Sequence, residues 1–210
     1  MWSPASAQRW RRAFRWLPAC LGRRISALAG QYVRAHPPRS PVLSGFGAAL
    51  PGFLADFAPL RRLGYLPDVA RLELALRDSY HAADAAPLPP EALQALPPER
   101  LAAARLRLAP AVRLVVSDWP IVAIWRFNRE DGPKPAMAAE GALVSRPGYD
   151  PVIASLTPAG AAFVAALAAE KPLGAALEAA AARDAAFDPA PTLGALISGG
   201  ALVSLEEPAP

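Results

Sequence analysis

Proline occupies 25 of the 210 positions in this sequence, and no other feature limits more strongly what the chain can fold into. A proline inside a helix removes a backbone hydrogen bond and clashes with the preceding turn. The residue before a proline is also pushed out of the helical region. Alanine, which favours helices, is abundant. The sequence therefore predicts a mainly α protein with a small α+β part, in which helices are short and joined by loops.

The best-organised stretch covers residues 65–84 and predicts the helix against which the other elements pack. Five of its residues recur at steps of three or four and share one face of a helix: Val69, Leu72, Leu76, Tyr80 and Ala83. We expect this face to point into the core. Pro67 fits the first turn of the helix, and Asp68 suits the positive end of the helix dipole.

Positive charge is concentrated at the start of the chain. Residues 1–34 contain seven arginines and no acid, whereas residues 142–210 contain three basic and seven acidic side chains. A basic segment with interleaved tryptophans is typical of an arm that binds phosphate or anionic lipid. Chain ends are often loosely held, however, and we interpret residues 1–24 as an atypical N-terminus that is disordered or mis-started.

Cysteine usage and hydropathy indicate the compartment. Cys20 is the single cysteine, so an intramolecular disulfide is excluded and a reducing, cytoplasmic location is expected. The apolar piece at residues 16–21 is interrupted by Pro18 and is too short for a secretory signal. The longest apolar stretch, residues 152–169, contains polar and helix-breaking residues and predicts a buried helix rather than a membrane span. We expect no membrane partner.

Residues 25–110 predict a helical domain. A first helix should start at Ile25 and end before His36, which two prolines follow. A second should carry apolar residues around Leu50 and Phe53, and the helix over residues 65–84 comes next. Residues 85–110 contain two Pro-Pro pairs, each followed by glutamate, which predicts one or two short helical turns within a linker.

Residues 111–141 predict a connection made of a strand, a helix and a loop. The β-branched run at residues 111–116 favours the strand, and Pro120 fits the start of the helix. Trp119 and Trp125 are expected to anchor the packing between the two halves of the chain. Stacking on nucleic-acid bases is the alternative role for these tryptophans, but stacking platforms normally come with a basic groove.

Residues 142–207 predict a winged-helix-like domain. The turn after Arg146 separates two strands, at residues 142–146 and 152–156, and favours a hairpin. Thr157 and Thr192 are candidate helix caps, and Gly199-Gly200 should end the last helix. Three helices are expected, over residues 158–169, 173–182 and 192–197, and a closing strand over residues 201–205.

The sequence predicts no catalytic or metal-binding constellation. Its two histidines, His36 and His81, are far from Cys20 in sequence and supply neither a nucleophile–base pair nor a zinc-ligand set. Asp68 and Glu73 lie about 140° apart around a helix and cannot act as paired carboxylates. A glycine-rich phosphate loop is also missing. We therefore expect a protein that is not an enzyme and needs no cofactor.

A winged-helix outline raises two binding functions. In DNA-binding members the last helix enters a groove, and phosphate contacts dominate the affinity. Here residues 188–200 contain no lysine or arginine and their neighbours are acidic. The same scaffold can bind an extended peptide along its hairpin through backbone hydrogen bonds, which need no positive charge. We favour the peptide, with Leu143, Val144 and Ser145 as contacts; a DNA-binding transcriptional regulator is the alternative.

Four parts of the sequence resemble the HvfC/BufC family, which has long been labelled as DNA-binding. The matching segments are residues 35–57, residues 65–85, residues 117–126, and the EGALVSRPG and SGGALV motifs of the C-terminal part. The resemblance extends over about residues 25–205. It implies a helical N-terminal domain and a smaller C-terminal domain similar to peptide-recognition winged helices.

The resemblance also implies a function. It points to a peptide-modification chaperone, the partner of a multinuclear non-haem iron oxidative enzyme of the same operon, with which the chain would form a heterodimer. Together the two proteins would modify cysteines of a ribosomally made precursor peptide, and the iron and the chemistry would belong to the enzyme. The candidate contacts with the enzyme are His36 and Arg39 in the proline-rich loop, and Asp68 and Arg71 on the predicted helix.

Overall fold

The structure is a computed structural model that describes residues 25–37, 47–129 and 133–207. It is about 49% helical with 15% strand, which confirms the predicted α-rich class with a smaller β part. The chain divides into two compact units, each made of two stretches. The first unit combines the described residues up to Leu74 with Trp119–Met137, and the second combines Ala75–Asp118 with the described residues from Ala138 onward.

The two units divide the sequence differently from the predicted domains. The predicted domains over residues 25–110, 111–141 and 142–207 are consecutive segments, whereas each unit of the structure combines an earlier with a later stretch of the chain. The predicted atypical N-terminus, residues 1–24, lies outside the described residues. No helix in the described part of the chain is both long enough and apolar enough to cross a bilayer.

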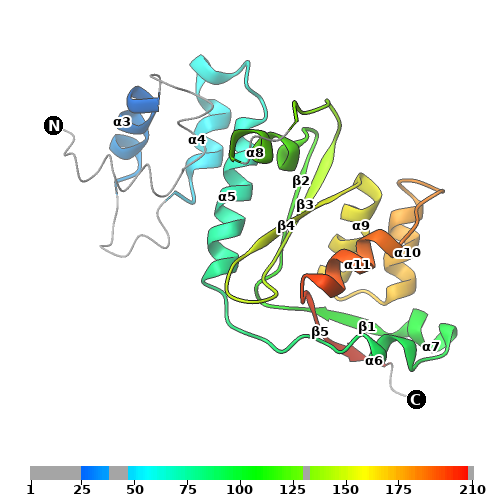
Figure 1. Cartoon of the computed structure of the whole chain (residues 1–210). Helices are drawn as coiled ribbons and strands as arrows, with labels where there is room; N and C mark the ends of the chain where they lie inside the picture. Colours follow the sequence, from blue (N-terminus) through cyan, green and yellow to red (C-terminus); the bar gives the residue numbers. More distant parts are fainter. Residues whose placement is uncertain (1–24, 38–46, 130–132, 208–210) are drawn as a thin grey trace. The chain divides into compact units, whose positions relative to one another are not determined.

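The first unit is built of helices. In chain order these are α3 (Ile25–Ala35), α4 (Leu50–Asp56), the short 3-10 helix η3 (Ala58–Leu60), the first part of α5 (Leu66–Tyr80) and α8 (Ile121–Arg129) (Figure 1). Helix α3 ends before the prolines, as predicted, and α8 begins directly after Pro120. The buried residues of this unit include Tyr32, Leu54, Leu72 and Val122.

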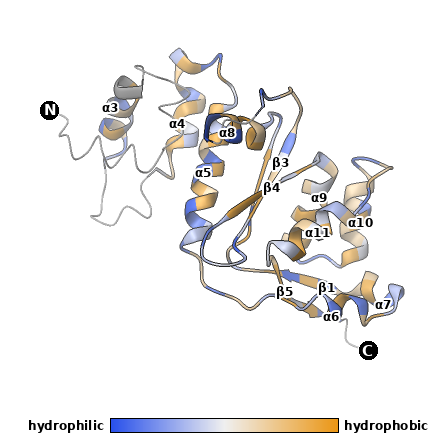
Figure 2. Cartoon of the chain, in the orientation of Figure 1, coloured by the Kyte–Doolittle hydropathy of each residue, from blue (hydrophilic) through white to orange (hydrophobic). Residues whose placement is uncertain are grey.

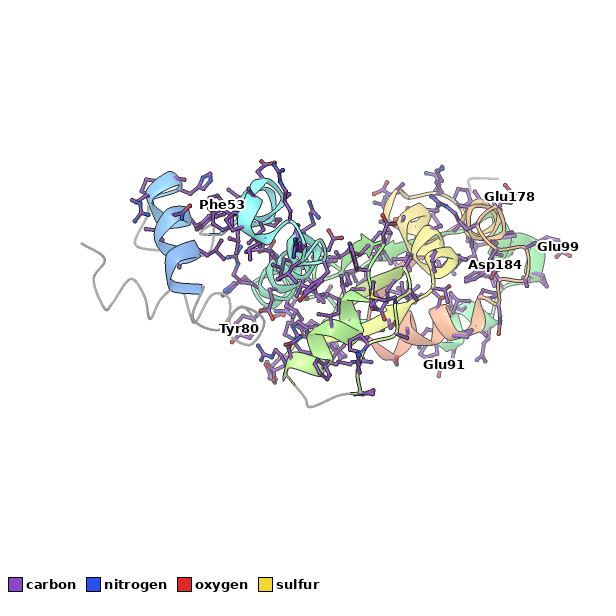
Figure 3. The ribbon with its side chains drawn as sticks, turned by 90° about the horizontal axis from the view of Figure 1, so that it is seen from above. Phe53, Tyr80, Glu91, Glu99, Glu178 and Asp184 are labelled. Atoms are coloured by element: carbon purple, nitrogen blue, oxygen red, sulfur yellow. The ribbon has the colours of Figure 1, made fainter. Side chains whose placement is uncertain are left out.

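Helix α5 is shorter than the sequence predicts. Its hydrophobic and hydrophilic residues alternate along its length (Figure 2), and Val69 and Leu72 are buried as expected. Tyr80 was expected in the core, but its side chain is 53% exposed (Figure 3). Tyr80 is the last helical residue, and Ala83 beyond it is also exposed. The helical periodicity therefore stops predicting burial at the point where the helix itself stops.

The second unit contains a three-stranded antiparallel sheet. Its strands lie in the order β2 (Arg113–Ser117), β3 (Glu140–Ser145) and β4 (Val152–Leu156). The hairpin of β3 and β4 confirms the predicted one, with Ser145 opposite Val152. One face of the sheet packs on the helix that follows, because a Cβ atom on Gly141 of β3 would lie 2.7 Å from that of Ala161.

Three helices follow the sheet: α9 (Pro158–Ala168), α10 (Leu173–Ala181) and α11 (Ala190–Ser198). Thr157 caps α9 as predicted, since its Oγ1 accepts a hydrogen bond of 3.0 Å from the Gly160 amide. The prediction that Thr192 caps the third helix is wrong. Thr192 is buried inside α11, and the helix starts two residues earlier at Ala190, whose N–H donates to Asp188 Oδ1 at 2.9 Å.

Glycine ends α11 as the sequence predicts. Gly199 is the last residue with near-helical backbone, and Gly200 has a φ of 57°, in the left-handed region that glycine adopts without steric cost. The amide of Ala201 then donates to the carbonyl of Leu196 at 2.8 Å, which is the hydrogen bond of a Schellman motif. This turn directs the chain into the last strand.

That last strand, β5 (Leu202–Glu206), pairs antiparallel with β1 (Arg105–Leu108) in a separate two-stranded sheet. β1 lies in the stretch that the sequence analysis treated as a linker, and so it was missed. Two short helices of the same stretch, α6 (Glu91–Gln94) and α7 (Pro98–Ala103), match the predicted turns that follow the Pro-Pro pairs. The missed strand closes the second unit, because it joins the linker to the end of the chain.

The core of the second unit contains residues of β1, β3, β4, β5 and the three helices. Phe163 is its largest fully buried side chain, and its ring lies 5.9 Å from that of Phe187. Other buried members of the core are Leu106, Leu143, Leu156, Val164, Leu167, Leu173, Leu196 and Leu202. Alanines of α9 and α10 fill the space between these larger residues, so the helices approach closely.

Ser79, in the last turn of α5, carries a buried hydroxyl group that lacks a hydrogen-bond partner among the described residues. A buried unsatisfied polar group costs about 1–3 kcal/mol. We expect Ser79→Ala to raise the free energy of unfolding by about 1 kcal/mol, because alanine removes this cost and favours the helix. Urea denaturation followed by circular dichroism measures the change. A loss of stability would show that the hydroxyl is satisfied, for example by a buried water molecule.

Candidate functional site

The predicted peptide contacts Leu143, Val144 and Ser145 lie on β3, the central strand of the three-stranded sheet. β3 pairs with β2 on one side and with β4 on the other, so that Leu143 stands between Leu114 and Ala154. All three predicted contacts are buried. A peptide cannot add to a strand whose two edges are already paired. The prediction that the peptide pairs with β3 is therefore wrong. Only the outer strands of this sheet, β2 and β4, have an edge to which a peptide could add.

β4 is the better edge for an extended ligand. In the described part of the chain it is the last strand on its side of the sheet. Val152 at its start is 44% exposed, and Ser155 near its end is also exposed. The strand has no charged residue and no proline, the features by which proteins commonly protect an edge. An outer strand of this kind offers a row of backbone donors and acceptors.

Helix α11 approaches the start of β4. Gly199 at the end of the helix lies so close to Ser145 that a Cβ atom on it would clash with the serine hydroxyl group. Because Ser145 is the pairing partner of Val152, the last turn of α11 is brought to this end of β4 (Figure 1). Ile197 lies in that turn and is 36% exposed. The helix itself carries no charged residue.

Arg146, directly after β3, anchors the hairpin turn to the segment that ends α5. Its Nη1 donates to the carbonyl oxygen of Tyr80 at 2.7 Å, and its Nη2 donates to the carbonyl oxygen of Ala82 at 2.9 Å and to Asp84 Oδ1 at 2.7 Å. The guanidinium group thereby satisfies carbonyls at the end of α5, which have no partner within the helix. The side chain is only 9% exposed. This role was not predicted, because a single arginine in a hairpin turn is the only signal of it in the sequence.

Trp119 and Trp125 both lie in the first unit. Trp125 Nε1 donates a hydrogen bond of 2.6 Å to Glu73 Oε1, and the guanidinium carbon of Arg129 lies 5.1 Å from the Trp125 ring centre. Trp119 meets Tyr65 edge-on, with 6.3 Å between the ring centres. Trp125 therefore joins α8 to the middle of α5, and Trp119 contacts Tyr65 just before that helix. Their role between the two halves of the chain stays a prediction.

The hydrogen bond between Trp125 and Glu73 should contribute measurably to the free energy of unfolding. We expect Trp125→Phe to lower the free energy of unfolding by about 1–2 kcal/mol, because the Glu73 side chain, 11% exposed, loses a donor while most of the ring packing is kept. Urea denaturation followed by circular dichroism gives the value. Glu73→Gln, which keeps an acceptor for the indole, should cost less. Equal effects of the two variants would contradict this explanation.

The predicted contacts with an enzyme are located in the first unit, apart from Arg39, which lies outside the described residues. His36 is exposed directly after α3, and its ring lies 5.0 Å from that of Tyr32. Asp68 and Arg71 form an ion pair on the surface of α5. These positions are compatible with a docking face, but the role of the four residues stays a prediction.

Charge on the second unit is mostly negative. Asp150 lies just before β4, and Glu140 at the start of β3 accepts a hydrogen bond from Ser155. On the two-stranded sheet, the hydrogen bond to Glu206 and the charges of Glu170 and Glu206 raise the pKa of Arg107. Within the described ranges, no three side chains of His, Cys, Asp or Glu converge in a way that could hold a metal ion.

The outer strand β4, the end of α11 and the turn held by Arg146 thus form one surface of the second unit, which we call the β4 surface. Comparison with known proteins gave no match to any family and no match to a curated protein. The β4 surface is suited to binding an extended chain through its backbone, with an apolar side chain against Val152 and Ile197.

Proposed function

We propose that this chain is a non-catalytic recognition subunit that presents a ribosomally made, Cys-containing precursor peptide to a multinuclear non-haem iron oxidative enzyme. The observation that carries the proposal is the outer strand β4 beside the uncharged helix α11. The resemblance of residues 35–57, 65–85 and 117–126 to the HvfC/BufC family supports it and supplies the class of the enzyme.

In this proposal the second unit acts as a winged-helix-like peptide-recognition domain. The precursor peptide adds a strand alongside β4, on the edge that faces away from β3, and is held there by main-chain hydrogen bonds. Side chains of an extended peptide alternate between the two faces of the sheet. Those on the α11 side contact Val152 and Ile197, and they give the complex its apolar component.

Docking on the enzyme is assigned to the first unit, through the exposed His36 and the pair of Asp68 and Arg71. The chain would then hold the peptide with one unit and the enzyme with the other. Iron binding, oxidation and cysteine modification take place in the enzyme. The contribution of this chain is to raise the concentration of the peptide next to the enzyme, which needs no reactive group of its own.

The test is co-purification of the full chain with the iron enzyme encoded beside it and with the precursor peptide. We expect a complex of the three. Val152→Asp should weaken peptide binding at least about tenfold, because a charged side chain at the end of β4 opposes the added strand. Val152→Thr is the matched control, since it keeps the β-branched shape, and both variants should still bind the enzyme. A chain that binds neither partner would refute the proposal.

Binding to DNA is the competing function. The last helix of the second unit would be the reading helix, and it has no lysine or arginine to contact phosphates. We expect no retardation of duplex DNA by the full chain at low salt. Retardation whose affinity falls steeply with rising salt would replace the proposal by that of a transcriptional regulator.

A further inference from the structure

We infer that the enzyme surface that receives the first unit is acidic, and that Arg61 and Arg62 bind its carboxylates. This rests on the proposed function, because it describes how the first unit would dock on the iron enzyme. Two observations carry it: the charges of the two units, and the contacts of the turn on which the two arginines lie.

The two units carry charges of opposite sign. The described residues of the first unit contain seven basic side chains against three carboxylates, whereas those of the second unit contain eight against thirteen. Charge of the opposite sign on a partner speeds association, and charge of the same sign excludes wrong partners. A protein that docks on the first unit is therefore expected to present negative charge to it.

Several cations of the first unit already have a role within it. Arg71 forms an ion pair with Asp68, and Arg129 Nη1 lies 3.8 Å from Glu73 Oε1. Arg34 lies in the last turn of α3, where a cation interacts favourably with the helix dipole. These three arginines thus have a structural explanation that needs no ligand.

Arg61 and Arg62 have no such explanation. They are adjacent and exposed in the turn between η3 and α5. Neither forms an ion pair with any carboxylate of the described residues, including Asp56 at the end of α4. Two neighbouring cations without a counter-charge repel each other, and a carboxylate placed between or beside them relieves this repulsion.

The backbone of this turn is fixed by its neighbours. Leu60 is 5% exposed and its amide donates to the carbonyl oxygen of Phe57 at 2.9 Å, while the amide of Leu63 donates to that of Leu60 at 2.8 Å. Gly64 lies so close to Trp119 that a Cβ atom on it would be 2.9 Å from the indole ring. The two arginines therefore start from an ordered backbone, and binding a partner restricts mainly their side chains.

The surroundings of the turn favour a protein surface over a phosphate polyanion. Phe57, which precedes η3, is half-buried, and its ring stacks on the half-buried ring of Phe53 with 5.4 Å between the ring centres. Aromatic residues and arginines are the residues enriched at protein interfaces. A guanidinium group also matches the two oxygens of a carboxylate with two parallel hydrogen bonds. The turn thus fits the aspartates and glutamates of a folded partner.

The experiment measures binding of the full chain to the iron enzyme encoded beside it by biolayer interferometry. Arg61→Glu with Arg62→Glu should weaken binding at least about tenfold, because attraction becomes repulsion, and the loss should shrink as salt is added. Lys171→Glu with Arg183→Glu is the matched control. It makes the same change in net charge at exposed residues of the second unit and should weaken binding less than about threefold.

A charge-conserving pair tests the role of the guanidinium groups. Arg61→Lys with Arg62→Lys should weaken binding by about two- to fourfold, because lysine keeps the charge but cannot form the paired hydrogen bonds. All variants change exposed side chains, so their urea unfolding curves should coincide with that of the wild type. The precursor peptide should bind the wild type and the Arg61→Glu, Arg62→Glu variant equally.

The outcomes separate this inference from the proposed function. Equal binding of the enzyme by the wild type and by Arg61→Glu with Arg62→Glu would overturn the inference and leave the recognition subunit in place. An equal loss in the control pair would overturn it too, because net charge and not the turn would then set the affinity. A wild-type chain that does not bind the enzyme would overturn the proposed function. Tighter, arginine-dependent binding to a 20-base-pair duplex or to phosphatidylglycerol vesicles would assign the turn to phosphate groups instead.

Discussion

Replacing Arg146 by alanine should destabilise the second unit by about 2–4 kcal/mol. One guanidinium group binds the carbonyl oxygens of Tyr80 and Ala82, and it is almost completely removed from solvent. Hydrogen bonds from a charged donor contribute more than those between neutral groups, and partly buried carbonyl groups that lose their donor add a desolvation cost. The hairpin turn would also lose its attachment to the end of α5.

Hydrogen exchange measured by mass spectrometry is the suitable assay, because it reports on the second unit separately. In Arg146→Ala we expect faster exchange in peptides from β3, β4 and the segment after Tyr80. Arg146→Lys should recover only part of the protection, since an ammonium group cannot span several carbonyl groups as the guanidinium fork does. Asp84→Asn should cost less than about 0.5 kcal/mol, because the Asp84 side chain is 96% exposed. A large effect of Asp84→Asn would instead show that the ion pair with Asp84, and not the hydrogen bonds to the carbonyl groups, provides most of the stabilisation by Arg146.

Phe163→Ala should have the largest effect, a loss of about 3–5 kcal/mol. Phe163 is fully buried at the centre of the second core and contacts the ring of Phe187. Truncation removes most of a large apolar side chain and leaves a cavity. The helices around it consist largely of alanine, which has no flexible side chain that could move into the space.

Phe163→Leu is the matched control, because leucine keeps most of the buried volume and should cost about 1–2 kcal/mol. Urea denaturation followed by circular dichroism gives the free energies, and hydrogen exchange in α9 and α10 locates the effect. A small loss in Phe163→Ala would mean that the core collapses around the missing ring. It would then be less rigid than its alanine-rich helices suggest.

Local signals in the sequence were sufficient to predict most of the individual helices and strands. The hairpin of β3 and β4, the capped start of α9 and the glycine end of α11 each depend on a few adjacent residues whose chemistry is specific. The prolines likewise placed the ends of α3 and the starts of α6 and α7. These features are fixed within one or two turns of chain, and a single sequence contains that information.

Features that depend on distant residues could not be predicted in the same way. Arg105–Leu108 forms a strand because β5 pairs with it, and β5 follows almost a hundred residues later. The sequence predicts β3 as an edge strand, because nothing in its own residues indicates that β2 pairs with its other side. Tyr80 continues the helical spacing of apolar residues in α5, but this spacing does not indicate at which residue the helix ends.

The candidate site illustrates the same limit. The sequence predicted the hairpin of β3 and β4, and the uncharged segment before Gly199 favoured a peptide over DNA. It did not identify β4 as the outer strand, since strand order is a property of the whole sheet. It also could not show that Arg146 faces the end of α5, which lies more than sixty residues earlier in the chain.

The construction of each unit from two stretches sets an order for folding during synthesis. The first unit needs Trp119–Met137, and these residues leave the ribosome only after all of Ala75–Asp118 has been made. At about 5–20 residues per second, helices α3 and α4 and the start of α5 wait several seconds for α8, which completes the first unit. The second unit waits longer, because its strand β1 is complete well before β5 at the far end of the chain. The nascent chain therefore exposes apolar surface until β5 has been made, and a chaperone at the ribosome exit is expected to increase its yield.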